Sequence, residues 1–267
     1  MGYHVLPSYT HYWSSEPDLG VEIVASTMTR SRFQALLSNL HVKNEANATE
    51  NDKLWKLRPL IDRLNLNFGK LYNANQCQSI DESMILFKSR STLKQYCPMK
   101  PIKRGYKLWV RADSSGYISK FCVYQGKVTK SYGQFPATFG LGESVVASLC
   151  HDIFQKGHKI FFDNFFTFLP LLSFLKEKDT FGCGTIRANR KGLPAGMKTD
   201  KQMQRGDYDY RVSDDGLLFC KWMDNKAVTI ASNYHGTAPT SVKRTQKDGT
   251  REQVACPEAV RAGFLFS

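Results

Sequence analysis

Apolar and polar residues follow a helical period over the first 75 residues of the chain. Apolar positions recur at i, i+3, i+4 and i+7 in two runs, which comprise Phe33, Leu36, Leu37 and Leu40, and then Leu57, Leu60, Ile61, Leu64 and Phe68. Thr29 and Ser31 precede the first run as candidate N-caps, and Pro59 is tolerated in the first turn of the second. The polar residues 43–53 predict a loop between two helices. We therefore predict a helical region over residues 1–75.

The pattern becomes a mixture of strands and helices over residues 76–186. It predicts, in order, a strand over 78–87, a hairpin of 106–112 and 117–124, a helix ending at Gly157, a strand over 158–166, a helix capped by Thr167 and a strand over 181–186. Three antiparallel strands followed by parallel strands that alternate with helices are typical of an RNase H-like fold. We therefore predict an α/β protein whose core, residues 76–186, is an RNase H-like mixed sheet.

Residues 187–236 lose the helical period. Glycines are frequent, and the alternation from Asp207 to Val212 predicts short antiparallel strands, with another over 227–234. We interpret this segment as a β-rich insertion. Residues 237–267 are polar before a short apolar end, and we interpret them as a truncated C-terminal segment.

Two acids, Asp81 and Asp163, each lie within an apolar run that predicts a buried strand. A buried carboxylate is costly unless a partner or a metal compensates it. The two strands are neighbours in the predicted sheet, where a pair of carboxylates would repel by about 4 kcal/mol at an effective dielectric constant of about 20. Mg²⁺ or Mn²⁺ would turn that repulsion into coordination and could activate a nucleophile for attack on a phosphodiester. The alternative is that both acids cap helices or pair with arginines.

The net charge of +13 predicts an anionic partner. DNA is favoured over a membrane, since no basic amphipathic helix or membrane-spanning run stands out. The alternative is a basic surface that serves solubility only.

Basic residues concentrate in one run that contains no acid. We predict that it binds nucleic acid, through Lys88, Arg90, Lys94, Lys100, Lys103, Arg104 and Lys107, with Tyr96, Tyr106 and Trp109 interleaved. The alternative is a solvated loop leading into a hairpin strand, in which Trp109 belongs to the core. A second candidate cluster comprises Arg187, Arg190 and Lys191, for which a simple charged loop is an equal alternative.

The seven cysteines are spread along the chain without a CxxC pair, so we expect no zinc site and free thiols in a reducing compartment.

Short motifs along nearly the whole chain resemble the piggyBac family of DNA transposases and the host proteins derived from them. In family order they are His11–Ser14, Met28–Phe33, Leu54–Asn65, Ile80–Glu82, Pro98–Pro101, Gly105–Lys107, Asp163–Thr167 and Gly184–Arg187. The resemblance implies an RNase H-like catalytic core with a β-rich insertion, preceded by a helical dimerisation and DNA-binding region. It also implies DNA as the partner and the nucleus as the location.

In the family, Asp81 and Asp163 correspond to the first two acids of a three-aspartate metal site. The third belongs to a Gly-Val-Asp segment beyond the stretch that matches Cys256–Arg261, and this sequence continues instead with Ala262–Ser267. We therefore expect the third aspartate to be absent and the Mg²⁺ (or Mn²⁺) site to be incomplete.

Three functions remain open. The first is a nuclease and strand transferase that acts at TTAA-type sites. The second is a derivative that binds DNA or a protein without cutting, and the third is a piece of a complete transposase. Apolar sheet surface left uncovered would favour a homodimer or poor solubility.

Overall fold

The computed structural model describes residues 4–42, 52–126, 135–136, 138–246 and 249–265. The chain divides into two compact units, Met1–Leu60 and Ile61–Ser267. Most of the loop predicted over residues 43–53 lies outside the described residues.

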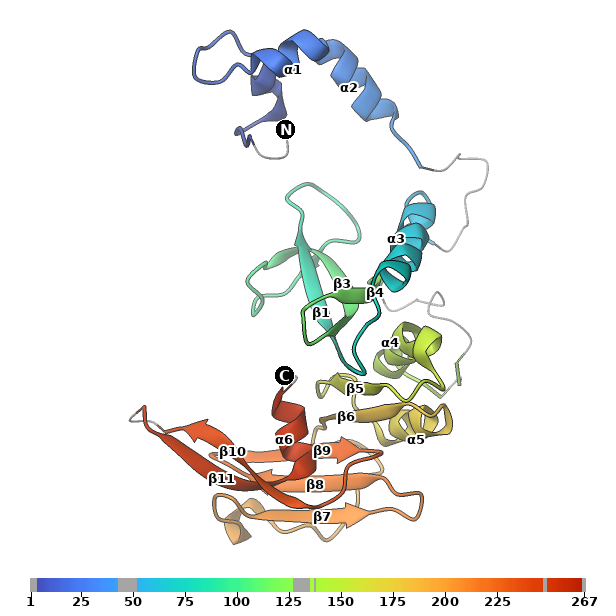
Figure 1. Ribbon diagram of the computed structural model, residues 1–267, viewed down its shortest axis with the longest axis vertical. Helices are drawn as coiled ribbons and strands as arrows, with labels where there is room; N and C mark the ends of the chain where they lie inside the picture. The colour runs from blue at the N-terminus through green and yellow to red at the C-terminus, as the bar shows by residue number, and fades with distance from the viewer. Residues whose placement is uncertain (1–3, 43–51, 127–134, 137, 247–248, 266–267) are drawn as a thin grey trace. The chain divides into compact units, whose positions relative to one another are not determined.

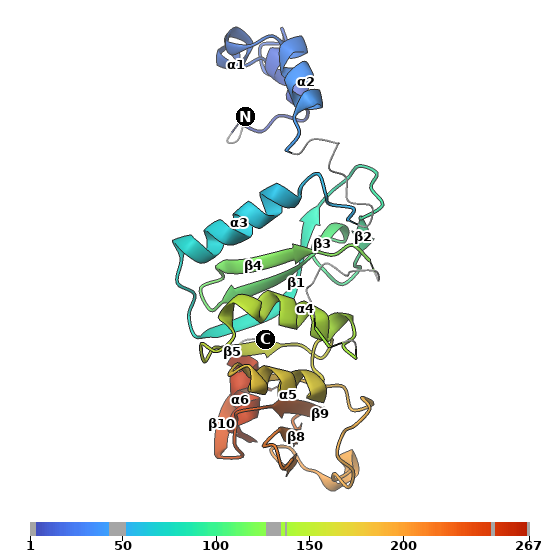
Figure 2. The same cartoon turned by 90° about the vertical axis from the view of Figure 1, so that its right-hand side faces the viewer.

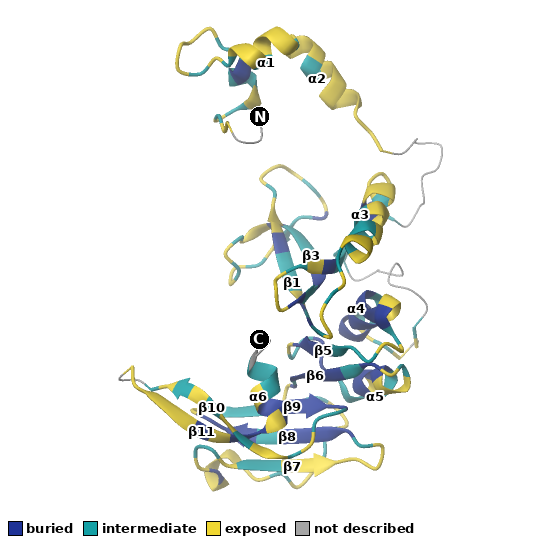
Figure 3. Cartoon of the chain, viewed as in Figure 1, coloured by how far each residue is buried: buried dark blue, intermediate teal, exposed yellow. Residues whose placement is uncertain are grey.

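The first unit is helical, as the apolar period predicts. It contains the 3₁₀ helix η1 (Tyr9–Trp13), α1 (Glu22–Thr27), α2 (Arg30–Asn39) and the beginning of α3 (Arg58–Leu71), which continues into the second unit. The Thr29 side chain caps α2 by accepting a hydrogen bond from the Arg32 backbone N–H, which confirms one of the two candidate caps. The rings of Tyr9 and Trp13 pack against Phe33 on α2. The other apolar residues of α2 remain exposed (Figure 3).

The second unit is built on one nine-stranded sheet (Figures 1 and 2). Its strand order is β2-β3-β1-β5-β6-β9-β8-β7, with β4 also paired to β3. The strands are β1 (Cys77–Leu86), β2 (Gln95–Tyr96), β3 (Arg104–Asp113), β4 (Ile118–Val123), β5 (Lys159–Phe162), β6 (Phe181–Thr185), β7 (Tyr208–Val212), β8 (Leu218–Met223) and β9 (Ala227–Ser232).

The directions of the strands agree with the RNase H-like layout predicted from the sequence. Strands β1, β3 and β4 are antiparallel, whereas β5 runs parallel to β1 and β6 runs parallel to β5. Helix α4 (Leu141–Cys150) precedes β5, and α5 (Leu169–Glu177) joins β5 to β6. The strands predicted as a β-rich insertion extend this same sheet, because β9 pairs antiparallel with β6 and is followed outward by β8 and β7.

Helices cover both faces of the sheet. On one face, α4 and α5 contribute Val146, Leu149 and Leu172 to a core with Ile80 and Trp109. On the other, α6 (Glu258–Leu265) packs Ala259 and Val260 in a cluster with Phe161, Cys183 and Trp222. A separate two-stranded sheet, β10 (Pro239–Thr245) and β11 (Arg251–Pro257), adds Val254 and Cys256 to that cluster. Within the described residues, no helix is both long and apolar enough to cross a bilayer.

Three local predictions were wrong. The strand predicted over residues 158–166 ends at Phe162, because the Asp163 carbonyl accepts hydrogen bonds from Phe166 and Thr167 and turns the chain. Thr167 does not cap α5; Phe168 is the N-cap residue, and the Thr167 hydroxyl donates to the Asp163 carbonyl at 2.8 Å. Helix α4 ends at Cys150 rather than near Gly157, because a 3₁₀ turn over His151–Ile153 follows it.

Candidate functional site

The sheet brings Asp81 and Asp163 together. The last paired residues of the parallel strands β1 and β5 are Ile80 and Phe162, and each acid is the next residue in its chain. Both acids line a pocket of about 350 Å³ at the point where the pairing of β1 with β5 ends. Glu82, Lys100, Thr185 and Gly263 of α6 also line it. Two carboxylates that lie 82 residues apart in the sequence thus share one site.

Neither acid is buried, contrary to the prediction. The Asp81 side chain is 61% exposed, and Asp163 is exposed beyond the end of its strand. The Asp163 carboxylate accepts a hydrogen bond from the Phe165 backbone N–H at 2.9 Å, so it shapes the turn that follows β5. Full burial therefore does not require a metal here, and what points to a cation is the partial burial of the Asp163 carboxyl together with the nearby charge of Asp81.

The pocket disfavours the charged form of Asp163. Partial burial of its carboxyl raises the pKa of Asp163, and the nearby negative charges of Asp81 and Glu82 raise it further. The hydrogen bond from Phe165 opposes this shift but does not reverse it. Two carboxylates that share one pocket are a setting that a cation would stabilise.

Lys100 is the cation closest to the acid pair among the ion pairs of the described residues. Its ammonium lies 3.8 Å from Oδ2 of Asp81 and 3.5 Å from Oε1 of Glu82. Glu82 also pairs with Lys107. Although burial opposes the effect, Lys107 and Lys100 lower the pKa of Glu82. Strand alternation predicts that Glu82 and Asp81 point to opposite faces of the sheet. It does not predict that the Lys100 ammonium contacts both of them.

The predicted basic run divides into paired and exposed residues. The Lys107 side chain is 18% exposed, and its ammonium lies 4.1 Å from the centre of the buried Trp109 ring, so this lysine is committed to the fold. The Lys94 ammonium donates to the carbonyl of Ser89 at 3.0 Å. The exposed members of the run are Lys88, Arg90, Lys103 and Arg104, which lie on the β1–β2 and β2–β3 connections or at the start of β3.

Arg187 and Arg190 hold the turn that follows Asp163. The Arg187 Nε donates to Oδ1 of Asn164 at 2.9 Å, and Nη2 of Arg190 donates to the Asn164 carbonyl at 2.9 Å. The Arg190 guanidinium also lies 3.7 Å from the centre of the Phe168 ring. Their sequence position, just after β6, did not predict this placement beside an acid. Lys191 is exposed.

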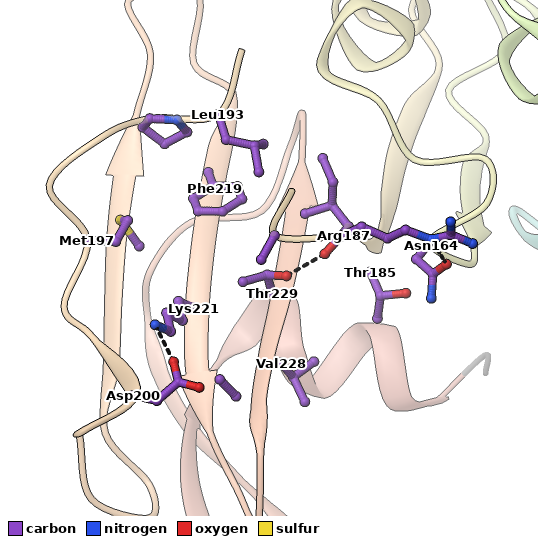
Figure 4. A pocket seen from close by; sticks show the side chains of 14 residues that line it. Asn164, Thr185, Arg187, Leu193, Met197, Asp200, Phe219, Lys221, Val228 and Thr229 are labelled. Atoms are coloured by element: carbon purple, nitrogen blue, oxygen red, sulfur yellow. Dashed lines mark hydrogen bonds and ion pairs between the residues drawn. The ribbon is translucent and has the colours of Figure 1, made fainter. Parts of the chain in front are cut away.

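A second pocket, of about 570 Å³, lies beside this turn (Figure 4). Asn164, Thr185 and Arg187 line one end of it, and Phe219 of β8 lies farther along. An ion pair of 2.6 Å between Lys221 and Asp200 lies among its remaining lining residues.

The donor atoms of the site partly fit a hard divalent cation. Asp81 and Asp163 supply carboxylate oxygens, which Mg²⁺ and Mn²⁺ prefer. Over the part of the chain that the structure describes, no group of three or more His, Cys, Asp or Glu residues is arranged to hold a metal ion.

Comparisons with known proteins agree with this fold. A family model described as "Transposase IS4" matches residues 1–262. The human piggyBac transposable element-derived protein 3 is 34% identical over 99% of this chain, and the human piggyBac transposable element-derived protein 2 is 32% identical over 97%. The chain spans 45% of the length of each of these relatives.

Among solved structures, a piggyBac transposase synaptic complex with hairpin DNA superimposes with a TM-score of 0.72. The match covers 90% of this chain and 49% of the transposase chain at 23% identity, so it bears on the fold alone. The family model over residues 1–262 defines a transposase-type protein. The chain belongs to the piggyBac-type transposase family.

Proposed function

We propose that this chain is a transposase-derived DNA-binding protein that holds duplex DNA beside the Asp81–Asp163 pair without cutting it. The observation that carries the proposal is the placement of the exposed cations. Lys88 and Arg90 follow β1, which bears Asp81, and Lys103 and Arg104 lead into β3, its neighbour. A net charge of +13 supplies the long-range attraction for a polyanion. The family implies that the protein acts in the nucleus.

A second candidate function is Mg²⁺-dependent cleavage and transfer of DNA strands at TTAA sites. It is supported by the raised pKa of Asp163, because partly buried carboxylates that repel one another in one pocket suit a divalent cation. Asp81 and Asp163 would hold the ion, which would neutralise charge on a phosphate oxygen when bound. Arg187 and Arg190 would keep the Asp163 turn in place through Asn164. Among the described residues no group of three or more His, Cys, Asp or Glu side chains is arranged to hold a metal ion, so we rank this function second.

Salt-dependent binding of the full chain to a fluorescent DNA duplex tests the proposal. We expect the logarithm of the binding constant to fall with the logarithm of salt by about 0.9 per phosphate contacted. The double substitution Lys103→Ala and Arg104→Ala should weaken binding and reduce that slope by about 2, since each basic residue accounts for about one phosphate. A parallel incubation of supercoiled plasmid with Mg²⁺ should yield no nicked product.

The matched control is the double substitution Lys243→Ala and Arg251→Ala, which removes one exposed lysine and one exposed arginine from the β10–β11 hairpin. Equal weakening by this control would refute the proposed surface, and salt-independent binding or no binding would refute DNA binding itself. Nicking that requires Mg²⁺ and disappears in Asp81→Ala would instead support the second candidate function.

A further inference from the structure

Met99, on the connection between β2 and β3, has a solvent-exposed side chain. Met99 is 94% exposed, more than any other large apolar side chain that the structure describes. Its backbone is fixed on both sides, since the Cys97 N–H donates to the Lys103 carbonyl at 2.8 Å and the Lys100 N–H donates to the Cys97 carbonyl at 3.2 Å. Pro98 and Pro101 restrict the same segment further. The exposure of Met99 is thus set by a tight turn.

The surroundings of Met99 are basic. Residues 97–104, here called the β2–β3 tip, include Lys100, Lys103 and Arg104, and no acid occurs between residues 88 and 111. The Arg104 guanidinium lies 5.2 Å from the centre of the exposed Tyr96 ring. A partner for this tip needs an anionic exterior and an apolar interior that a single side chain can enter. A DNA duplex meets both conditions, because its phosphates surround stacked bases.

The β2–β3 tip is tied to the acid pair. Lys100, the residue after Met99, places its ammonium 3.8 Å from Oδ2 of Asp81, and the same ammonium donates to the Glu82 carbonyl at 3.4 Å. Consecutive Cα atoms are about 3.8 Å apart, so Met99 lies one residue from the side chain that contacts the acid. DNA bound by the β2–β3 tip would therefore lie beside Asp81 and Asp163.

We propose that Met99 is a wedge that inserts between base pairs of bound duplex DNA and unstacks one step next to the acid pair. The inference rests on the DNA binding proposed above and adds a mode of binding to it. Apolar wedges, methionine among them, partly unstack and kink duplexes when basic side chains hold the flanking phosphates. Lys103 and Arg104 are the exposed cations of the same β2–β3 tip.

Duplexes that carry 2-aminopurine at successive positions test the wedge, because unstacking raises the fluorescence of this base. Wild-type chain should raise it at one step, and Met99→Ala should abolish the rise. Met99→Ala should also bind a fully paired duplex about tenfold more weakly, which corresponds to about 1.4 kcal/mol. A duplex with a mismatch at that step should restore most of the affinity, since it is already unstacked. Met99→Leu should retain the wild-type behaviour.

The control is Val212→Ala, which shortens another exposed apolar side chain, on β7, and should change neither signal. Wild-type binding without any rise in fluorescence, or an unchanged Met99→Ala, would overturn the wedge while leaving the proposed DNA binding intact. No binding by the wild-type chain would overturn both. If Met99→Ala binds DNA normally but loses binding to phosphatidylserine vesicles, the tip serves a membrane surface and the wedge is wrong.

Discussion

At the scale of single residues, the surroundings of Asp163 on balance disfavour its negative charge. Its pKa is raised by partial burial and by the charges of Asp81 and Glu82, and Lys100 contacts those two acids rather than Asp163. A raised pKa means that the folded state favours the protonated carboxyl, so this group reduces the stability of the fold once the pH exceeds its unfolded pKa. Functional residues commonly reduce the stability of the folded protein.

We predict that Asp163→Asn stabilises the chain at neutral pH by about 0.5 kcal/mol, a modest value because solvent screens the charges. The asparagine Oδ1 can still accept the hydrogen bond from Phe165, so the turn is kept. Urea unfolding monitored at several pH values should show the gain shrinking as the pH falls through the raised pKa of Asp163. Asp62→Asn, a substitution of an exposed acid on α3, is the control and should change little. A loss of stability in Asp163→Asn would refute the argument.

The residues of the site were only partly predictable. The apolar runs around Asp81 and Asp163 correctly indicate neighbouring strands, which bring the two acids together. The end of β5 was missed, because the turn depends on hydrogen bonds made by Asp163 that leave no trace in the apolar pattern. The contacts of Lys100 and Arg190 with the site depend on tertiary folding and could not be derived from spacing.

At the scale of elements, regular periodicity decides which parts of the fold can be predicted. The β3–β4 hairpin and α5 follow clear patterns and are present. Strand β10 is mostly polar; it pairs with the following strand β11, and the ion pair of Arg244 with Asp224 links it to the end of β8. Helix α6 has only eight residues, and it depends on packing Ala259 and Val260 against the sheet. Elements of this kind are stabilised by tertiary contacts rather than by their own pattern.

Close approach of β6 to the Asp163 turn gives a prediction for these elements. A Cβ at Gly184 would overlap the Phe162 carbonyl oxygen and the Thr167 hydroxyl. Because both belong to the segment that places Asp163, Gly184→Ala should destabilise the chain by about 1–3 kcal/mol, the usual cost of overpacking. Gly69→Ala in α3 is the matched control: apart from the backbone of its own helix and its chain neighbours, no atom of the described residues lies within 4 Å of the added Cβ, and it should stabilise the helix by up to about 1 kcal/mol. Thermal unfolding of the two variants should shift in opposite directions; a shift in the same direction would contradict the packing argument.

At the scale of the whole molecule, the structure gives a different reason to expect self-association from the one that the sequence suggested. An uncovered sheet was expected to cause it, whereas α4, α5 and α6 pack against the two faces of the sheet. Exposed apolar residues are found on α2 of the first unit and at its C-cap, where Leu36, Leu37 and the C-cap residue Leu40 are 45%, 51% and 78% exposed. A helix that presents an apolar stripe to solvent commonly packs against another copy or partner.

We predict that the chain forms a homodimer through α2 and that Leu37→Glu with Leu40→Glu abolishes it. Two introduced charges would have to be buried without partners in the dimer, which is costly, whereas in the monomer they face water. Sedimentation velocity over a range of concentrations should show a monomer–dimer equilibrium for the wild-type chain and only monomer for the variant. Ser38→Glu adds a charge at an exposed polar position of the same helix and should leave the dimer intact. A wild-type chain that stays monomeric throughout, or a dimer that survives the double substitution, would show that α2 is not the contact surface.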